Sequence, residues 1–284
     1  MKKILLASTI LVGTAGFAAA DNANFTFSGS AYVGAGYETA GGVFRPEIKS
    51  SFTASMVTMS DMGLEAGASI TIDARGASFE SDWTDGAFGT FSENGSSISN
   101  SSVYLKGDWG KLAVVYDDDG SGVGATTTDW DMVFTYSHTF GDFGVSAYYT
   151  VAIDGATGTN GDFGVKGTYS FGDYSVYAKV DYDNSDPAWS VGLGGSATFS
   201  GVTLGASVDY DNFTADWDWK ATADYKSGAY GVGVFAEDDG VDDAVDYGIW
   251  ASYDLGGGIS VKGAYSYDQD NATGLAQLGV AMSF

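Results

Sequence analysis

The residues best suited to binding a cation are gathered in a few acidic tracts. Asp117, Asp118 and Asp119 are consecutive, and the polar stretch that they open ends at Asp129. Clustered carboxylate oxygens are the ligands that Ca²⁺ prefers, so these three aspartates are candidate ligands of a weakly bound calcium ion. No acidic tract matches the EF-hand loop or the glycine-rich nonapeptide of calcium-binding β-rolls. Solvated loop carboxylates with no ligand are the simpler interpretation of the same residues.

The residue types that nucleophilic catalysis needs are nearly missing from the chain. His138 is the single histidine, and there is no cysteine. Neither a Ser-His-Asp nor a Cys-His arrangement is therefore expected, and the acids are too numerous for any pair to indicate glycoside cleavage. His138 stands among aromatic residues near a turn, where an interfacial or subunit contact is the more natural role. We expect no enzymatic activity.

A glycine-rich stretch raises the question of a nucleotide cofactor. Gly120, Gly122 and Ala125 fit the G-x-G-x-x-A pattern of dinucleotide-binding loops. Such a loop must lead into a helix, whereas residues 126–130 read Thr-Thr-Thr-Asp-Trp, so no cofactor is expected. The formal net charge of −25 also argues against a nucleic-acid partner.

The N-terminus has the three parts of a secretory signal peptide. Lys2 and Lys3 form a basic n-region, residues 4–17 are mostly apolar, and Ala18 to Ala20 form a cleavage site of small residues. We therefore expect residues 1–20 to be removed, leaving one domain over residues 21–284. No later segment has the run of about 18 apolar residues that a membrane helix needs.

The elements that must position the charged residues are predicted to be strands. In residues 130–153 apolar and polar side chains alternate on both sides of Gly141-Asp142, which is the pattern of a β-hairpin. Each arm has about ten residues, enough for a tilted strand to cross a bilayer. Sixteen such segments follow one another from Asn24 to Phe284, among them residues 64–74 and 101–106.

One face of these strands suits contact with a membrane, and the other face suits contact with water. Many strands end in an aromatic residue on the apolar face, such as Tyr182, Tyr210 and Phe171, which is typical of the two interfaces of a membrane. The other face carries charges such as Asp218 and Lys220, which would be costly without water. About sixteen strands close into a barrel with an aqueous interior. The alternative, a soluble β-sandwich, does not fit a cysteine-free chain of this size as well.

Five stretches carry a family resemblance: DMGLEAGAS (61–69), VYLKGDWGKL (103–112), FTYS (134–137), ASYDLGGGISVKG (251–263) and LGVAMSF (278–284). Together they resemble the alphaproteobacterial general porins, the sixteen-stranded trimeric diffusion pores of the outer membrane. The resemblance implies an all-β antiparallel transmembrane barrel with short periplasmic turns and longer extracellular loops. It also implies a homotrimer, contacts with outer-membrane lipid and lipopolysaccharide, and recognition of Phe284 by the barrel-assembly machinery.

In that family the third long loop folds into the barrel and faces a basic wall. The resemblance places this role on residues 117–129, although the loop is short and has neither Glu nor Pro. The candidate constriction comprises the acids Asp117, Asp118, Asp119 and Asp129 and the bases Arg45, Lys49, Arg75 and Lys106. Opposed charges across a narrow waist favour small polar solutes. The long segment 75–100 is an alternative source of the constriction, or a latch onto a neighbouring subunit.

The resulting functional expectation is a passive pore for small hydrophilic solutes and ions. The excess of acids predicts mild cation selectivity. Three alternatives remain open at this point: an exported calcium-binding or adhesive β-protein, an outer-membrane enzyme, and a substrate-specific outer-membrane channel.

Overall fold

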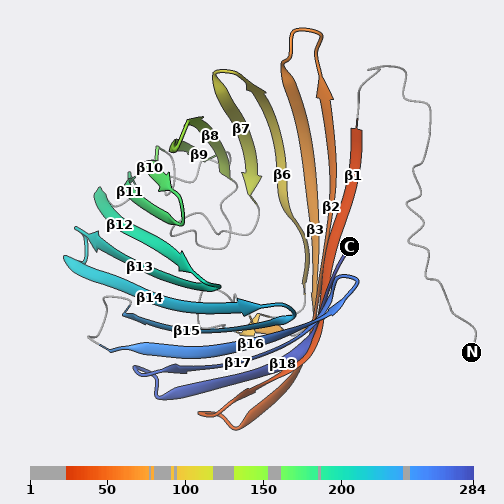
Figure 1. Cartoon of the computed structure of the whole chain (residues 1–284), viewed down its shortest axis with the longest axis vertical. Coiled ribbons are helices and arrows are strands. Elements are labelled where there is room, and N and C mark those ends of the chain that lie inside the picture. The colour runs from red at the N-terminus through yellow and green to blue at the C-terminus, as the bar shows by residue number, and fades with distance from the viewer. Residues whose placement is uncertain are drawn as a thin grey trace, which may run out of the picture.

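Sixteen antiparallel strands form a closed barrel in the computed structural model (Figure 1). The structure describes residues 24–76, 78–79, 91–92, 95–117, 131–152, 161–184, 187–238 and 244–284, so the expected signal peptide lies outside the described residues. The barrel strands are β1 (Asn24–Glu38), β2 (Val43–Met59), β3 (Glu65–Gly76), β6 (Gly95–Gly107), β7 (Gly110–Asp117), β8 (Asp131–Phe140), β9 (Phe143–Ala152), β10 (Phe163–Phe171), β11 (Tyr174–Asp183), β12 (Ala188–Phe199), β13 (Val202–Asp211), β14 (Asp216–Ser227), β15 (Tyr230–Asp238), β16 (Asp246–Gly256), β17 (Ile259–Asp268) and β18 (Thr273–Ser283). Two short strands, β4 (Ser78–Phe79) and β5 (Phe91–Ser92), pair with each other outside the barrel sheet.

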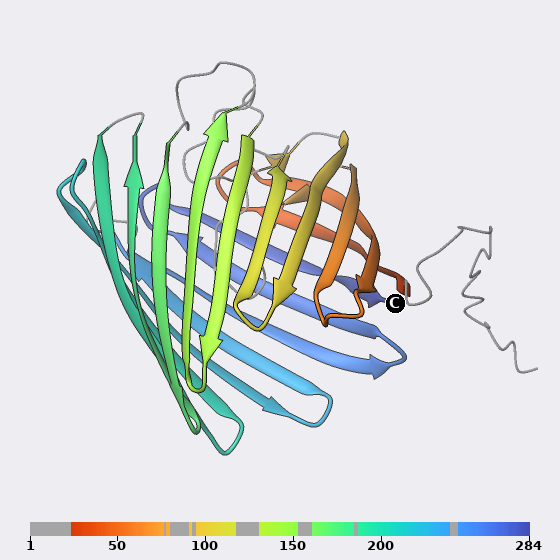
Figure 2. The ribbon, with the colours of Figure 1, turned by 90° about the horizontal axis from the view of Figure 1, so that it is seen from above.

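Each barrel strand pairs with its neighbours in the order of the chain, and β18 pairs with β1 to close the sheet. The described part of the chain contains no helix that is long and apolar enough to cross a membrane. The strands are tilted, and tight hairpin turns join them along one rim (Figure 2). We call this edge the turn rim and the opposite edge the loop rim.

The tight turns form where glycine supplies a backbone conformation that other residues avoid. Gly141, in the turn between β8 and β9, has φ 61°, and Gly172, between β10 and β11, has φ 62°. Both values lie in the left-handed region, which glycine adopts without a Cβ clash. The Gly-Asp pairs of the sequence therefore fix the ends of the strands and the register of the hairpins.

The barrel has almost no dry apolar core. Among the described residues, only Ala188 and Leu275 are buried hydrophobic residues. The large apolar side chains lie instead on the outer surface, where Val103 and Leu193 are each 60% exposed and Leu278 is 64% exposed. A soluble protein would not leave such a continuous apolar surface in water, so this surface suits the hydrocarbon of a bilayer.

Aromatic side chains form two bands on the outer surface, as predicted. At the turn rim the rings of Phe171 and Tyr174 stack with centroids 5.3 Å apart. At the loop rim Tyr210 lies between Trp189 and Trp217, with centroid distances of 5.7 and 4.9 Å. Amphipathic rings prefer the headgroup level of a membrane, so the two bands delimit the part of the barrel that contacts hydrocarbon.

The third and fourth barrel strands are longer than the sequence predicted. Strand β3 continues to Gly76 and β6 starts at Gly95, and Arg75 pairs with Gly95. A bulge between Thr71 and Ile72 shifts the register of this pairing. The prediction missed the extension because residues 95–102, Gly-Ser-Ser-Ile-Ser-Asn-Ser-Ser, have no clear alternation of polar and apolar side chains. The segment 75–100, expected as one loop, therefore begins and ends as strand.

The C-terminal residue completes the closure of the barrel. The backbone N–H of Gly29 donates to the carbonyl oxygen of Phe284 at 2.9 Å, and the N–H of Phe284 donates to Gly29 at 3.0 Å. The ring of Phe284 lies over Gly29, where a Cβ would meet it at 2.6 Å. The last residue of the chain is thus part of the seam between β18 and β1.

Candidate pore lining

The inner surface of the barrel is mostly polar. Inward hydroxyls of adjacent strands bond to each other, as between Ser69 and Ser102 at 2.7 Å and between Ser175 and Ser196 at 2.9 Å. Apart from Lys2 and Lys3, all of the chain's 12 lysines and arginines lie within barrel strands. Charged groups at these positions need water, so the interior is a hydrated channel.

Three of the predicted basic residues come together near the loop rim. Arg45 and Lys49 follow one face of β2, and Lys49 pairs in register with Arg75 of β3. Glu47 lies between Arg45 and Lys49 on the same face and is only 3% exposed. Its Oε1 accepts a hydrogen bond from the side-chain amide of Gln277 at 3.2 Å. Glu47 is thus a buried carboxylate held by a hydrogen bond, and a basic residue lies two positions before it and two positions after it on the same face of the strand.

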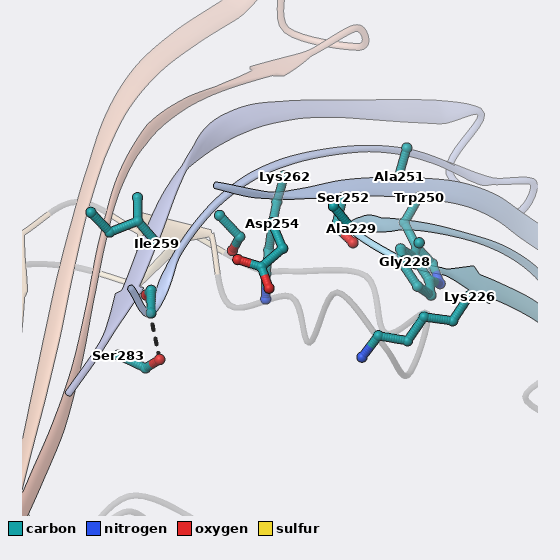
Figure 3. Close-up of a pocket in the computed structure, with 13 residues that line it drawn as sticks. Lys226, Gly228, Ala229, Trp250, Ala251, Ser252, Asp254, Ile259, Lys262 and Ser283 are labelled. Carbon is teal, nitrogen blue, oxygen red and sulfur yellow. Dashed lines mark hydrogen bonds between the residues drawn. The ribbon is translucent and has the colours of Figure 1, made fainter. Parts of the chain in front are cut away.

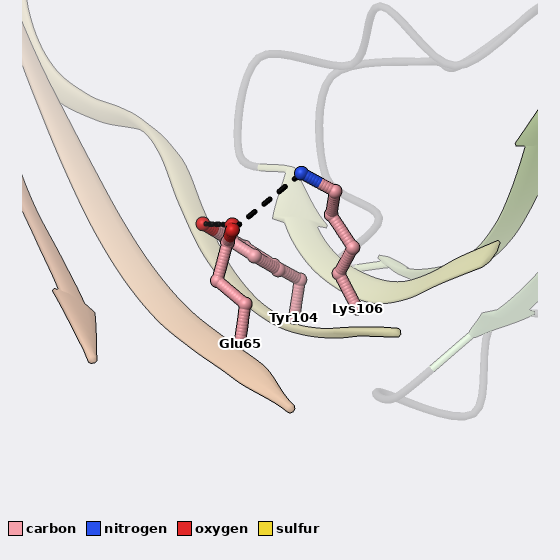
Figure 4. Close-up of polar contacts among 3 residues, drawn as sticks. All are labelled: Glu65, Tyr104 and Lys106. Atoms are coloured by element: carbon pink, nitrogen blue, oxygen red, sulfur yellow. Dashed lines mark hydrogen bonds and ion pairs between the residues drawn. The ribbon is translucent and has the colours of Figure 1, made fainter. Parts of the chain in front are cut away.

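Lys106, the fourth predicted base, lies at the opposite end of the barrel, where its side chain is close to Glu65 and Tyr104 (Figure 4). It pairs in register with Glu65, the first residue of β3, ten residues before Arg75 and therefore roughly 33 Å from it along the strand. Its Nζ lies 3.5 Å from Glu65 Oε2, and the Tyr104 hydroxyl donates to Glu65 Oε1 at 2.7 Å. The Nζ of Lys111 lies 4.2 Å from the centroid of the Tyr104 ring. The structure thus separates Lys106 from the other three bases.

The predicted acidic side of the constriction is only partly described. Asp117 is the last residue of β7, in register with Asn100 and Asp131. Asp118, Asp119 and Asp129 lie outside the described residues, and so does the candidate calcium site that they would form with Asp117. Among the residues that the structure does describe, no group of three or more His, Asp or Glu side chains is arranged to hold a metal.

Sequence reasoning missed two inward ion pairs on the part of the wall that strands β11 to β15 form. Lys179 of β11 lies 2.6 Å from Asp209 of β13, and Lys220 lies 3.1 Å from Glu237. The first pair spans the intervening strand β12 at Gly192, where a Cβ would meet Lys179 Cε at 2.5 Å and Asp209 more closely still. Parity placed Lys179 and Lys220 on the inner face, but Glu237 was expected in a loop, and the register that pairs these charges was not visible in the sequence.

A second feature is a set of aromatic side chains inside the barrel, of which sequence reasoning placed only Tyr177 on the inner face. Tyr104 lies over Gly67, Tyr177 over Gly194 and Phe235 over Gly248, so that each ring covers a glycine of an adjacent strand. The Nζ of Lys166 lies 4.2 Å from the Tyr177 ring centroid. Rings that cover strand glycines compensate for the missing side chain. An aromatic residue on the polar parity opposite a glycine is the signal that could have identified these contacts.

Comparison with known proteins agrees with this architecture. A family model described as Gram-negative porin matches residues 7–273. Two triple mutants of the porin from Rhodopseudomonas blastica superpose with a TM-score of 0.70 at 17% identity, over 92% of this chain and 100% of theirs. At that identity the likeness shows the fold alone. Among curated proteins there is no match. Because the family model covers most of its length, the chain belongs to the Gram-negative porin family.

Proposed function

We propose that the protein is a passive outer-membrane porin through which small hydrophilic solutes and ions diffuse. The observation that carries this proposal is the distribution of side chains, with an apolar exterior bounded by aromatic bands and a charged interior. No reaction is assigned to the interior. The tight turns of the turn rim would face the periplasm and the loop rim the medium, as in outer-membrane barrels generally.

Swelling of liposomes in sugars of graded size tests the proposal. The purified protein should admit small sugars and exclude larger ones with a smooth decline, because a general pore discriminates by size alone. A compact detergent-free monomer that leaves liposomes impermeable would contradict the proposal. The substrate-specific channel predicts a different curve, in which one solute enters much faster than others of its size.

Mild cation selectivity is part of the proposal. Inward positions near the loop rim carry many acids, among them Asp181, Asp209, Asp211, Asp216 and Asp218. Asp209 faces Asp218 and Asp211 faces Asp216 across β13 and β14, an arrangement of like charges that attracts counter-ions. Zero-current potentials in a KCl gradient should have the sign of potassium preference. A sign that indicates chloride preference would refute this part alone.

Several assignments rest on the family and await their own tests. We infer removal of residues 1–20 on export, a homotrimer, contact with lipopolysaccharide, and recognition of Phe284 by the barrel-assembly machinery. Mass spectrometry of the mature chain and native mass spectrometry in detergent would test the first two. Calcium binding by Asp117, Asp118 and Asp119 remains a proposal, and equilibrium dialysis with ⁴⁵Ca²⁺ against the triple Asp→Asn variant is its measurement.

A further inference from the structure

Trp250 is an indole on the water-filled side of the barrel wall. It occupies an inward position of β16, in register with Gly233 of β15. A Cβ at Gly233 would meet the indole Nε1, and a Cβ at Gly231 would lie 3.2 Å from Cζ3. The two ends of the ring system therefore cover two successive inward glycines, so the indole lies lengthwise along β15. A side chain in this position is held against the backbone and presents its other face to the channel.

The polar edge of the indole is also fixed. Asp224 of β14 pairs in register with Gly233, and its carboxylate forms a side-chain hydrogen bond with Trp250. The indole has a single donor, so this bond satisfies its hydrogen-bonding capacity. What remains open to the channel is apolar ring surface, which water solvates poorly.

A recess of about 360 Å³ lies beside this ring near the turn rim (Figure 3). Its lining includes Lys226, Ser252, Asp254 and Lys262 together with Trp250. Ammonium groups donate, carboxylates accept and hydroxyls do both. The recess therefore combines one flat apolar surface with polar groups of every kind, and its charges are of both signs.

The two lysines of the recess are available to a solute. Three other inward lysines, Lys106, Lys179 and Lys220, are occupied in ion pairs. Among the described residues, neither Lys226 nor Lys262 takes part in an ion pair or a cation–π contact. Figure 3 shows the Lys226 side chain extending away from the wall.

We propose that this recess is a weak binding subsite for a monosaccharide in its pyranose ring form. A pyranose has a flat face of C–H groups, which suits the indole, and a rim of hydroxyls that both donate and accept. Pockets that hold small ligands combine apolar surface with a few polar groups in this way. Two lysines and one aspartate leave the recess with little net charge, so its apolar ring face favours a neutral sugar over a simple ion. The inference rests on the proposed pore, because the sugar must reach the recess through the channel.

Single-channel recording with glucose and sorbitol tests the subsite. The two solutes are similar in size and hydroxyl content, but sorbitol is open-chained and has no ring face. Glucose should reduce the conductance in a saturable manner, whereas sorbitol should act only through viscosity. Trp250→Ala should weaken the glucose effect about fivefold or more, as expected when one aromatic contact is lost. Trp250→Phe should retain part of it.

The matched control is Phe235→Ala, which removes an inward aromatic residue of the adjacent strand that does not line the recess. It should leave the glucose affinity unchanged. If Trp250→Ala does not fold, Lys226→Gln and Lys262→Gln should each weaken the glucose effect. Equal responses of the wild type to glucose and sorbitol, or an unchanged affinity in these variants, would overturn the subsite. Absence of any KCl conductance in the wild type would instead overturn the proposed pore.

Discussion

Replacing Glu47 should loosen the barrel at its closing seam. Glu47 is 3% exposed and its partner Gln277 is 7% exposed, and their hydrogen bond joins β2 to β18 across β1. Arg45 and Lys49 lie on the same face of β2, two residues before and two residues after Glu47. In Glu47→Ala the buried amide of Gln277 loses its acceptor, and the cations on either side lose the carboxylate between them.

The expected cost follows mainly from the lost hydrogen bond. A buried donor whose acceptor is removed costs about 1–3 kcal/mol. Arg45 and Lys49 are only half-buried, so the loss of the carboxylate near them adds little. At about 2–4 °C for each kcal/mol, the unfolding temperature should fall by roughly 6 °C. Glu47→Gln should cost less, since it keeps an acceptor for Gln277.

The measurement is heat-modifiable migration on detergent gels, which distinguishes the folded barrel from the unfolded chain over a temperature series. The matched control is Asp73→Ala, which removes an inward acid of β3 that is only half-buried. This control should shift the transition by no more than about 2 °C. The reasoning fails if Glu47→Ala and Asp73→Ala unfold at the same temperature.

Three further predictions concern other parts of the inner wall. Glu65→Gln should leave stability almost unchanged, because Lys106 is 54% exposed in that pair and solvent screens the charges. It should nevertheless move the zero-current potential toward anions, and an unchanged potential would argue against a site on the ion path. Gly192→Val should lower the unfolding temperature by pushing Lys179 away from Asp209, whereas Gly144→Ala, whose nearest atoms would lie 4.0 Å away, should be neutral; equal effects in the gel assay would count against the steric argument. Cation preference should fade between 0.1 and 1 M KCl, as the Debye length falls from about 10 to about 3 Å, and a preference that persists would indicate a narrow dry filter.

The strands were predictable because membrane and water impose a period of two on every one of them. Side chains such as Phe171 and Tyr210 marked the outer bands, and Gly141 and Gly172 marked the turns. The extension of β6 was not predictable, because its serines suit either face. There the register with β3, a non-local contact, decides the structure.

The sequence predicted which side chains of the pore lining face inward, but not how far along the barrel axis each one lies. Parity placed Lys106 inside the barrel together with Lys49, yet only the pairing of β3 with β6 shows that the two lie at opposite rims. The inward aromatics other than Tyr177 were missed for a related reason. Trp250 contradicts the rule of a polar interior, and the glycines beneath it lie on another strand.

The confinement of lysine and arginine to barrel strands has a consequence for proteolysis. Trypsin cleaves only after these residues, and a protease must bind a locally unfolded segment of chain in its active site. The segments between the barrel strands after residue 20 contain no lysine or arginine and therefore no cleavage site. An intact barrel should therefore survive trypsin, and a single opened strand pair should expose the chain to digestion.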